Sequence, residues 1–278
     1  MIALGNDACR AVSVGDAACV GVYVGDAMVF PDALIYDETK IMVIELDEND
    51  EPTGNVEYFD TIAEASSYLS TEMLNEGTFW VRVGTDAGIS TLSQQAFLSK
   101  RNLIKVTLPD SVTRIQKQAF ISCVNLRITE LPQSIIFLGG SAFQNCASIK
   151  EIDLPILTGI TEIQDYMFSG CYSLRSIEIP NGIEYLGQYI FEGCTNLRSV
   201  TLPDTLKRIG AGTQSFASYT FKDCTALQSI TIPSSVTEIR SAVFSGCTSL
   251  ATITINKPEN SISGAPWGAA NATVIWTG

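Results

Sequence analysis

The sequence predicts an α/β solenoid of about seven coils, preceded by a small β-rich segment and an α/β cap. Three observations predict it. Phenylalanines recur at steps of 23, 23, 25, 23, 30 and 23 residues, at Phe97, Phe120, Phe143, Phe168, Phe191, Phe221 and Phe244. From the second unit on, a cysteine follows each phenylalanine by three residues, and most units close on an apolar-x-apolar-Pro ending. Such a period indicates a solenoid, because one unit cannot bury its own apolar face without stacked neighbours.

The order F-x-x-C-x-x-L-x-x-I-x-I/L-P resembles the BspA-like leucine-rich repeat family of bacterial surface proteins. The resemblance covers residues 89–255, and six units keep the cysteine, whereas the first has Lys100 in its place. It implies a curved, right-handed solenoid and, often, adhesion or another surface-recognition role. The resemblance does not imply an enzymatic activity.

Changes of pattern along the chain predict four segments. They are a β-rich attachment segment over 1–31, an α/β capping domain over 32–88, the solenoid over 89–255 and a C-terminal cap over 256–278.

The first segment carries a shorter repeat, in which Gly5, Gly15 and Gly25 are ten residues apart. Alternating stretches such as 20–24 predict strands, and the Gly-Asp pairs predict tight turns. The stretch 22–31, VYVGDAMVFP, resembles short modules near the ends of phage and prophage tail or fibre proteins. This implies attachment to other virion structural proteins through Val22, Tyr23, Gly25, Asp26 and Phe30. The other interpretation is a small β-cap on the next domain.

The second segment predicts a β-β-α-β cap. Ile41–Leu46 and Asn55–Phe59 indicate a hairpin, Thr61 and Glu64 form a capping box before a helix, and Thr78–Val83 alternates as a strand. Such a cap would cover the first open edge of the solenoid. The turn between the hairpin strands has the acids of a calcium loop, but Pro52 stands where glycine is needed, so we expect a solvated turn.

Each solenoid unit predicts one short strand that ends at the proline, with side chains alternating inward and outward. The column two residues before the proline is Thr107, Glu130, Asp153, Glu178, Thr201, Thr231 and, before Asn256, Thr254. The column four residues before it is Lys105, Ile128, Glu151, Ser176, Ser199, Ser229 and Thr252. Acids and hydroxyls on this outward face predict a ligand site at Glu130, Glu151, Asp153, Glu178, Thr201 and Thr231. The plain alternative is that Thr suits strands and Glu keeps a sheet soluble.

Two further stretches depart from the repeat. The fifth unit carries extra residues over 211–218, which predict a bulging loop with Phe216 and Tyr219 as its large side chains. Residues 256–278 break the period; Trp267 and Trp276 are expected to cover the last coil, and Thr273–Trp276 to add a strand.

The net charge of −13 is concentrated over 32–60, which holds ten acids and one base, whereas residues 97–255 hold twelve acids and thirteen bases. No basic stripe is present for nucleic acid or an anionic membrane surface, and no apolar run reaches the roughly 20 residues of a membrane span. The N-terminus lacks the pattern of a signal peptide, so we expect no export by that route.

The chain has no histidine, which removes Ser-His, Cys-His and His-metal chemistry. We therefore expect no catalytic residues, no metal and no cofactor. The cysteine column predicts reduced, buried thiols, because stacked positions point the same way and cannot face each other as a disulfide requires.

These observations favour a non-enzymatic virion appendage. Residues 1–31 would attach it to the particle, the solenoid would recognise a protein or glycan on a host surface, and we expect a homo-oligomer. The alternative is a bacterial cell-surface adhesin of the BspA-like type, and the minor alternative is a glycan-degrading tail enzyme.

Overall fold

The computed structural model describes residues 10–11, 22–24, 27–29, 37–70, 77–128, 130–155, 157, 159–211 and 217–278, with backbone alone before residue 37. The chain divides into two compact units. The N-terminal unit comprises Met1–Ile89 and Asn102–Pro109, and the solenoid unit comprises Ser90–Arg101 and Asp110–Gly278.

A three-stranded antiparallel meander lies at the start of the N-terminal unit. Its strands are β1 (Arg10–Ala11), β2 (Val22–Val24) and β3 (Ala27–Val29), paired in that order. The strands predicted from the alternating pattern are therefore present.

The other described residues of this unit form a four-stranded sheet and one helix. Its strands β4 (Ile41–Leu46), β5 (Pro52–Phe59), β6 (Thr78–Val83) and β8 (Leu103–Thr107) are ordered β5-β4-β6-β8. The helix α1 (Ile62–Tyr68) begins at the predicted capping box: the Glu64 amide donates to Thr61 Oγ1 at 3.2 Å, and the Thr61 amide donates to Glu64 Oε2 at 3.0 Å.

Strand β8 belongs to the first repeat, yet it pairs in parallel with β6 of the α/β segment. The edge of β6 is thus covered by the backbone of the first repeat. Side chains add to the pairing, since the Trp80 indole donates to Thr107 Oγ1 at 3.0 Å and the Lys105 ammonium lies 4.0 Å from the Trp80 ring centre.

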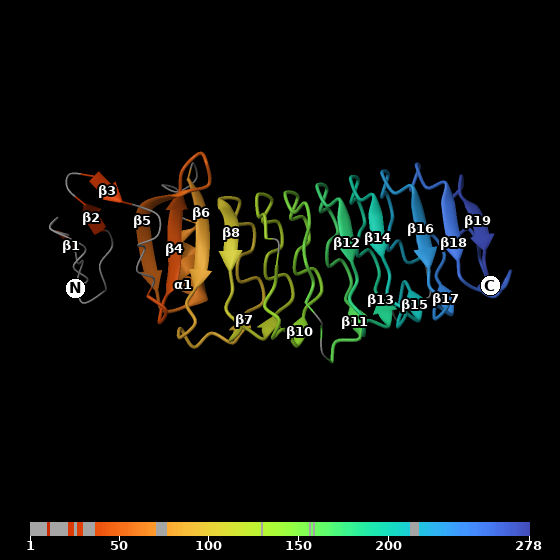
Figure 1. Ribbon diagram of the computed structural model, residues 1–278, viewed down its shortest axis with the longest axis horizontal. Helices are drawn as coiled ribbons and strands as arrows, with labels where there is room; N and C mark the ends of the chain where they lie inside the picture. The colour runs from red at the N-terminus through yellow and green to blue at the C-terminus, as the bar shows by residue number, and fades with distance from the viewer. Residues whose placement is uncertain are drawn as a thin grey trace. The chain divides into compact units, whose positions relative to one another are not determined.

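The solenoid unit stacks its coils in sequence order, with two rows of short parallel strands (Figure 1). The row that leads to the proline contains β12 (Ser176–Glu178), β14 (Ser199–Thr201), β16 (Ser229–Ile232), β18 (Thr252–Ile255) and β19 (Thr273–Trp276). The second row contains β7 (Thr91–Leu92), β9 (Arg114–Ile115), β10 (Phe137–Leu138), β11 (Glu162–Ile163), β13 (Tyr185–Leu186), β15 (Arg208–Ile209) and β17 (Glu238–Ile239).

The expectation of one strand per unit was wrong, because the second row adds a two-residue strand after the proline turn. Each of these strands ends in a buried Ile or Leu that follows a more exposed residue. A strand of two residues is too short to show a recognisable alternation in the sequence, so the parallel pairing of these strands is visible only in the structure.

The outward assignment of Ile128 was also wrong, since its side chain is 4% exposed. Among the residues of its coil that the structure describes, the first row has no strand and only an isolated bridge between Glu130 and Asp153. Without regular strand geometry the in-out alternation does not hold, and an apolar side chain turns into the core.

Seven phenylalanines form the centre of the solenoid core. Each is fully buried, and neighbouring rings stack with centroids 5.2–5.8 Å apart. The six cysteines of the repeats are free and buried beside them, as predicted for buried thiols.

The C-terminal segment closes the stack as predicted. Strand β19 pairs in parallel with β18, and Trp267 is 1% exposed, with its carbonyl accepting from the Phe244 amide at 3.0 Å.

Candidate binding surfaces

The predicted ligand residues are all exposed. Glu178, Thr201 and Thr231 lie on strands of the row that leads to the proline, whereas Glu130, Glu151 and Asp153 lie at the same place in earlier coils, outside the named strands. We call this surface the strand face, defined by Glu130, Glu151, Asp153, Glu178, Thr201 and Thr231. The structure brings two pairs of them directly opposite each other: Glu130 bridges Asp153, and Glu178 of β12 pairs with Thr201 of β14. Glu130 and Asp153 are therefore neighbours on successive coils.

A groove of about 410 Å³ interrupts the strand face between β14 and β16. The two strands belong to different sheets, β12-β14 and β16-β18-β19, so they do not share a hydrogen-bonded ladder. We call this the strand-face groove, and its lining residues are Arg198, Ser199, Val200, Thr201, Leu202, Asp204, Ser229, Ile230, Thr231, Pro233 and Asn256. Two predicted ligand residues, Thr201 and Thr231, thus line one concave site.

The predicted attachment residues cannot be placed as a site. Val22 and Tyr23 lie in β2, which pairs with β1 and β3, and only their backbone is described. Gly25, Asp26 and Phe30 lie outside the described residues, as does most of the inserted stretch, over 212–216.

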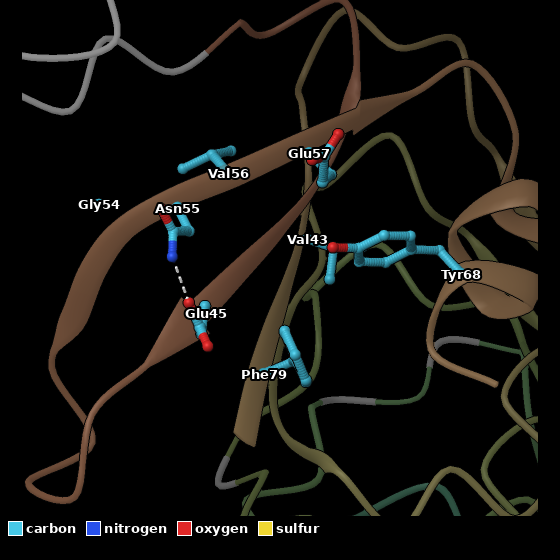
Figure 2. Close-up of a pocket in the computed structure, with 8 residues that line it drawn as sticks. All are labelled: Val43, Glu45, Gly54, Asn55, Val56, Glu57, Tyr68 and Phe79. Carbon is cyan, nitrogen blue, oxygen red and sulfur yellow. Dashed lines mark hydrogen bonds between the residues drawn. The ribbon is translucent and has the colours of Figure 1, made fainter. Parts of the chain in front are cut away.

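The N-terminal unit contains a pocket of about 410 Å³ beside α1, lined by Val43, Glu45, Gly54, Asn55, Val56, Glu57, Tyr68 and Phe79 (Figure 2). The Asn55 amide donates to Glu45 Oε2, so one carboxylate is held by its own hairpin. Burial, together with Glu57 and Glu45, raises the pKa of Tyr68. The Tyr68 phenol is therefore neutral at physiological pH and can donate a hydrogen bond beside these acids.

The turn with the acids of a calcium loop is held by its own backbone. Asp47 Oδ1 accepts from the amides of Glu51, at 3.0 Å, and Asn49, at 2.8 Å. These hydrogen bonds lower the pKa of Asp47. Within the part of the chain that the structure describes, no group of three or more acidic or cysteine side chains is arranged to hold a metal ion.

A second surface of the solenoid was missed in the sequence. It consists of the residues two positions before each core phenylalanine, all with positive φ: Gln95, Gln118, Ser141, Tyr166, Tyr189, Tyr219 and Ala242. Counting back two residues from each phenylalanine would have identified this column in the sequence. Its residue types vary, however, so no single motif marks it.

The middle of this column borders a pocket of about 510 Å³, which we call the ladder notch. Its lining residues are Lys117, Gln118, Gly140, Ser141, Glu162, Gln164, Asp165 and Tyr166. Burial and the neighbouring Asp165 raise the pKa of Glu162, which lies at its rim.

The family model for the BspA type leucine rich repeat region matches residues 90–216 and 209–266, in six copies. The chain belongs to this family of BspA-type leucine-rich repeat proteins. The matched residues include both the strand face and the ladder notch, so both surfaces are built from repeats of this family.

Solved structures agree with the repeat fold. A leucine-rich repeat protein from Bacteroides ovatus is 24% identical with a TM-score of 0.55, over 71% of this chain and 55% of that one. One from Eubacterium ventriosum is 28% identical with a TM-score of 0.52, over 61% and 42%. The leucine-rich repeat protein of T. pallidum is 26% identical with a TM-score of 0.50, over 62% and 83%.

The chain thus spans about half the length of the first two of these leucine-rich repeat proteins. No curated protein matches it. Among the described parts of the chain, no helix has both the length and the apolar character needed to cross a membrane.

Proposed function

We propose that this BspA-type repeat protein is a non-enzymatic structural and adhesion protein whose solenoid recognises a protein or glycan on a host surface. The observation that carries the proposal is the strand-face groove. It is concave, it lies between two strands that do not pair, and it is lined by serine and threonine hydroxyls with Arg198 and Asp204. Such groups both donate and accept hydrogen bonds, as recognition of a polar surface requires.

We propose that the protein is an appendage of a virion. It would be joined to other virion structural proteins through residues 1–31 and assembled as a homo-oligomer. Support comes from the resemblance of 22–31 to tail and fibre modules and from the meander β1-β2-β3, a small sheet that is marginal alone and gains stability from a partner surface. The bacterial cell-surface adhesin is the second candidate, because membership of the repeat family is compatible with an adhesin as well as with a virion appendage.

A glycan-degrading tail enzyme is the minor candidate. Its carboxylates would be Glu130, Glu151, Asp153 and Glu178, which are all exposed. Exposed carboxylates lack the enclosed cleft in which a glycosidase holds its sugar. Hydrolysis of a host polysaccharide that is lost in Glu151→Gln or Asp153→Asn would establish this activity instead.

The location of the protein, in a virion or in the cell envelope, is tested by mass spectrometry of gradient-purified particles and, separately, of the cell envelope from the source culture. Peptides of this chain in intact virions would support the appendage. Peptides only in the envelope would overturn it in favour of the adhesin. A chain that starts at Asp32 should lose incorporation into particles, and normal incorporation would contradict attachment through 1–31.

The recognition surface is tested by binding of the labelled protein to host cells. The double variant Thr201→Lys, Thr231→Lys fills the strand-face groove with long cationic side chains and should reduce binding about tenfold or more. The matched control is Ser176→Lys, an exposed position on β12 outside the groove. An equal loss in the control, or none in the double variant, would contradict recognition at the groove.

A further inference from the structure

Three tyrosines form a stacked ladder on the column that lies two residues before the core phenylalanines. The rings of Tyr166 and Tyr189 have centroids 4.7 Å apart and planes within 3° of parallel. The rings of Tyr189 and Tyr219 are 5.4 Å apart and tilted by 31°. All three are half-buried and have φ of 55–58°, so one backbone geometry presents each ring in the same way.

The ladder stops abruptly at Tyr166. Its ring has Tyr189 on one face, while the equivalent position in the preceding coil is Ser141, which brings only a hydroxymethyl group. The rung before that is Gln118, whose Oε1 accepts from Gln95 Nε2 at 3.0 Å. The ladder notch lies in this interval, because its lining includes Gln118, Ser141 and Tyr166 from three successive coils.

The size of the interval matches one ring. Coils stack about 4.8 Å apart, so the rungs of Gln118 and Tyr166 are about 10 Å apart with one empty rung between them. A ring placed there would lie close to 5 Å from each neighbour, which is the spacing of the Tyr166–Tyr189 pair. The notch is therefore a space one ring thick at the end of the tyrosine ladder, between Tyr166 and Gln118.

Glycines and side-chain hydrogen bonds shape the notch. A Cβ atom on Gly139, next to the lining residue Gly140, would lie 2.4 Å from the Lys117 backbone nitrogen, so the coils pack too closely there for a side chain. The Gly140 amide donates to Gln164 Oε1 at 2.9 Å, and the Gln188 amide donates to Asp165 Oδ1 at 2.7 Å. Both polar walls are thus held in place before a ligand binds, which lowers the entropic cost of binding.

The chemistry of the lining identifies the ligand class. The exposed face of Tyr166 carries negative partial charge and attracts the weakly positive C–H groups on one face of a sugar ring. Around it stand groups that donate, such as the Lys117 ammonium and the Gln164 amide, and groups that accept, such as the carboxylates of Glu162 and Asp165. This mixture suits hydroxyl groups, which both donate and accept.

We propose that the ladder notch binds one pyranose ring of a glycan, stacked on Tyr166 at the rung of Ser141. An anionic ligand is disfavoured, because the lining contains two carboxylates and only one ammonium group. A purely apolar ring would leave these polar groups without partners, which costs binding free energy. The site shares no residue with the strand-face groove, so it goes beyond the recognition surface proposed above.

The test uses the full chain and saturation-transfer NMR with methyl glycosides of glucose, galactose, mannose and N-acetylglucosamine at millimolar concentration. At least one glycoside should receive saturation from the wild-type protein. Ser141→Tyr fills the vacancy with a ring at a backbone conformation that three neighbouring tyrosines already adopt, and should weaken glycoside binding about tenfold or more. Tyr166→Ala should do the same by removing the stacking surface.

The matched control is Ala242→Tyr, which adds a ring at the equivalent position on the far side of Tyr219. Thermal unfolding verifies that each variant is folded, and the control should bind as the wild type does. Retention of binding in folded Ser141→Tyr, or no saturation of any glycoside by the wild type, would overturn the proposal. So would preferential binding of N-acetyltyrosinamide, which would assign the vacancy to an aromatic side chain of a protein.

Glycoside binding at the ladder notch should not depend on the strand-face groove. The Thr201→Lys, Thr231→Lys variant should still bind the glycoside, even where it no longer binds host cells. Loss of host binding in that variant with normal glycoside binding would separate the two sites, whereas glycoside loss there would place the sugar at the strand face and overturn the notch proposal.

Discussion

The thiol of Cys171 donates a hydrogen bond to the carbonyl oxygen of Phe143 in the preceding coil, at 3.2 Å. The other five repeat cysteines bond in the same way to the phenylalanine carbonyl of the coil before, at 2.8–3.2 Å. The cysteine column therefore has a physical role. Each of these carbonyls also accepts from a backbone amide, as the Phe143 carbonyl does from the Cys146 amide at 3.2 Å. The thiol supplies a second donor from a small side chain that also fills the core.

Replacing Cys171 by Ala should lower the free energy of unfolding by about 1–3 kcal/mol, because it leaves a small cavity and removes one of the two hydrogen bonds that the Phe143 carbonyl accepts. Urea unfolding followed by circular dichroism measures this. Tyr172→Ala is the matched control, since the neighbouring side chain is 51% exposed and should cost less than about 0.5 kcal/mol. Equal costs for both variants would argue against the thiol ladder.

Stability should fall at alkaline pH because of these thiols. Burial raises the pKa of Cys123 and of Cys171 to about 12, whereas a thiol in an unfolded chain titrates near pH 8.5. Below about pH 8.5 both states keep the proton and the stabilisation is complete. Between about pH 8.5 and 12 only the unfolded state loses it, so each such thiol should cost up to about 1.4 kcal/mol per pH unit.

The measurement is urea unfolding at several pH values from 7 to 10.5. The double variant Cys123→Val, Cys171→Val serves as the control for lysine and tyrosine titration. It should show a shallower decline than the wild type, and an identical slope would disprove the thiol contribution.

The phenylalanine stack should be more sensitive in its middle than at its start. Phe143 stacks on Phe120 and Phe168, at 5.4 and 5.8 Å, whereas Phe97 stacks on Phe120 alone, at 5.5 Å. Phe143→Ala should cost about 3–5 kcal/mol, and Phe97→Ala about 1 kcal/mol less because it loses one ring contact rather than two. Denaturant unfolding of both variants tests this, and a larger cost at Phe97 would contradict it.

Gly139 should tolerate no side chain. A Cβ there would meet the Lys117 backbone nitrogen at 2.4 Å, whereas one on Gly140 would meet nothing nearer than the Asp165 carbonyl oxygen at 3.1 Å. Gly139→Ala should therefore lower the melting temperature by several degrees, at about 1–3 kcal/mol of overpacking. Gly140→Ala is the control and should cost clearly less; the reverse order would show that the coil at Gly139 can shift.

Local patterns gave much of the fold in advance. The capping box of Thr61 and Glu64, the strand Thr78–Val83 and the closing strand Thr273–Trp276 are all present as predicted. Each depends on residues close together in sequence, which is why a short motif is enough. The candidate binding surfaces were anticipated only in part: Thr201 and Thr231 meet in one groove, but the tyrosine column carried no motif and was overlooked.

The sequence by itself determined that equal positions in successive units share one environment, because a fixed period stacks them. This explains why the phenylalanine and cysteine columns were predicted as core. Only the tertiary structure decided what happens between coils: the second row of two-residue strands, the inward turn of Ile128, the gap between β14 and β16 and the missing ring at Ser141. Each depends on the side chains and hydrogen bonds of two neighbouring coils together, which a repeat motif read one unit at a time does not contain.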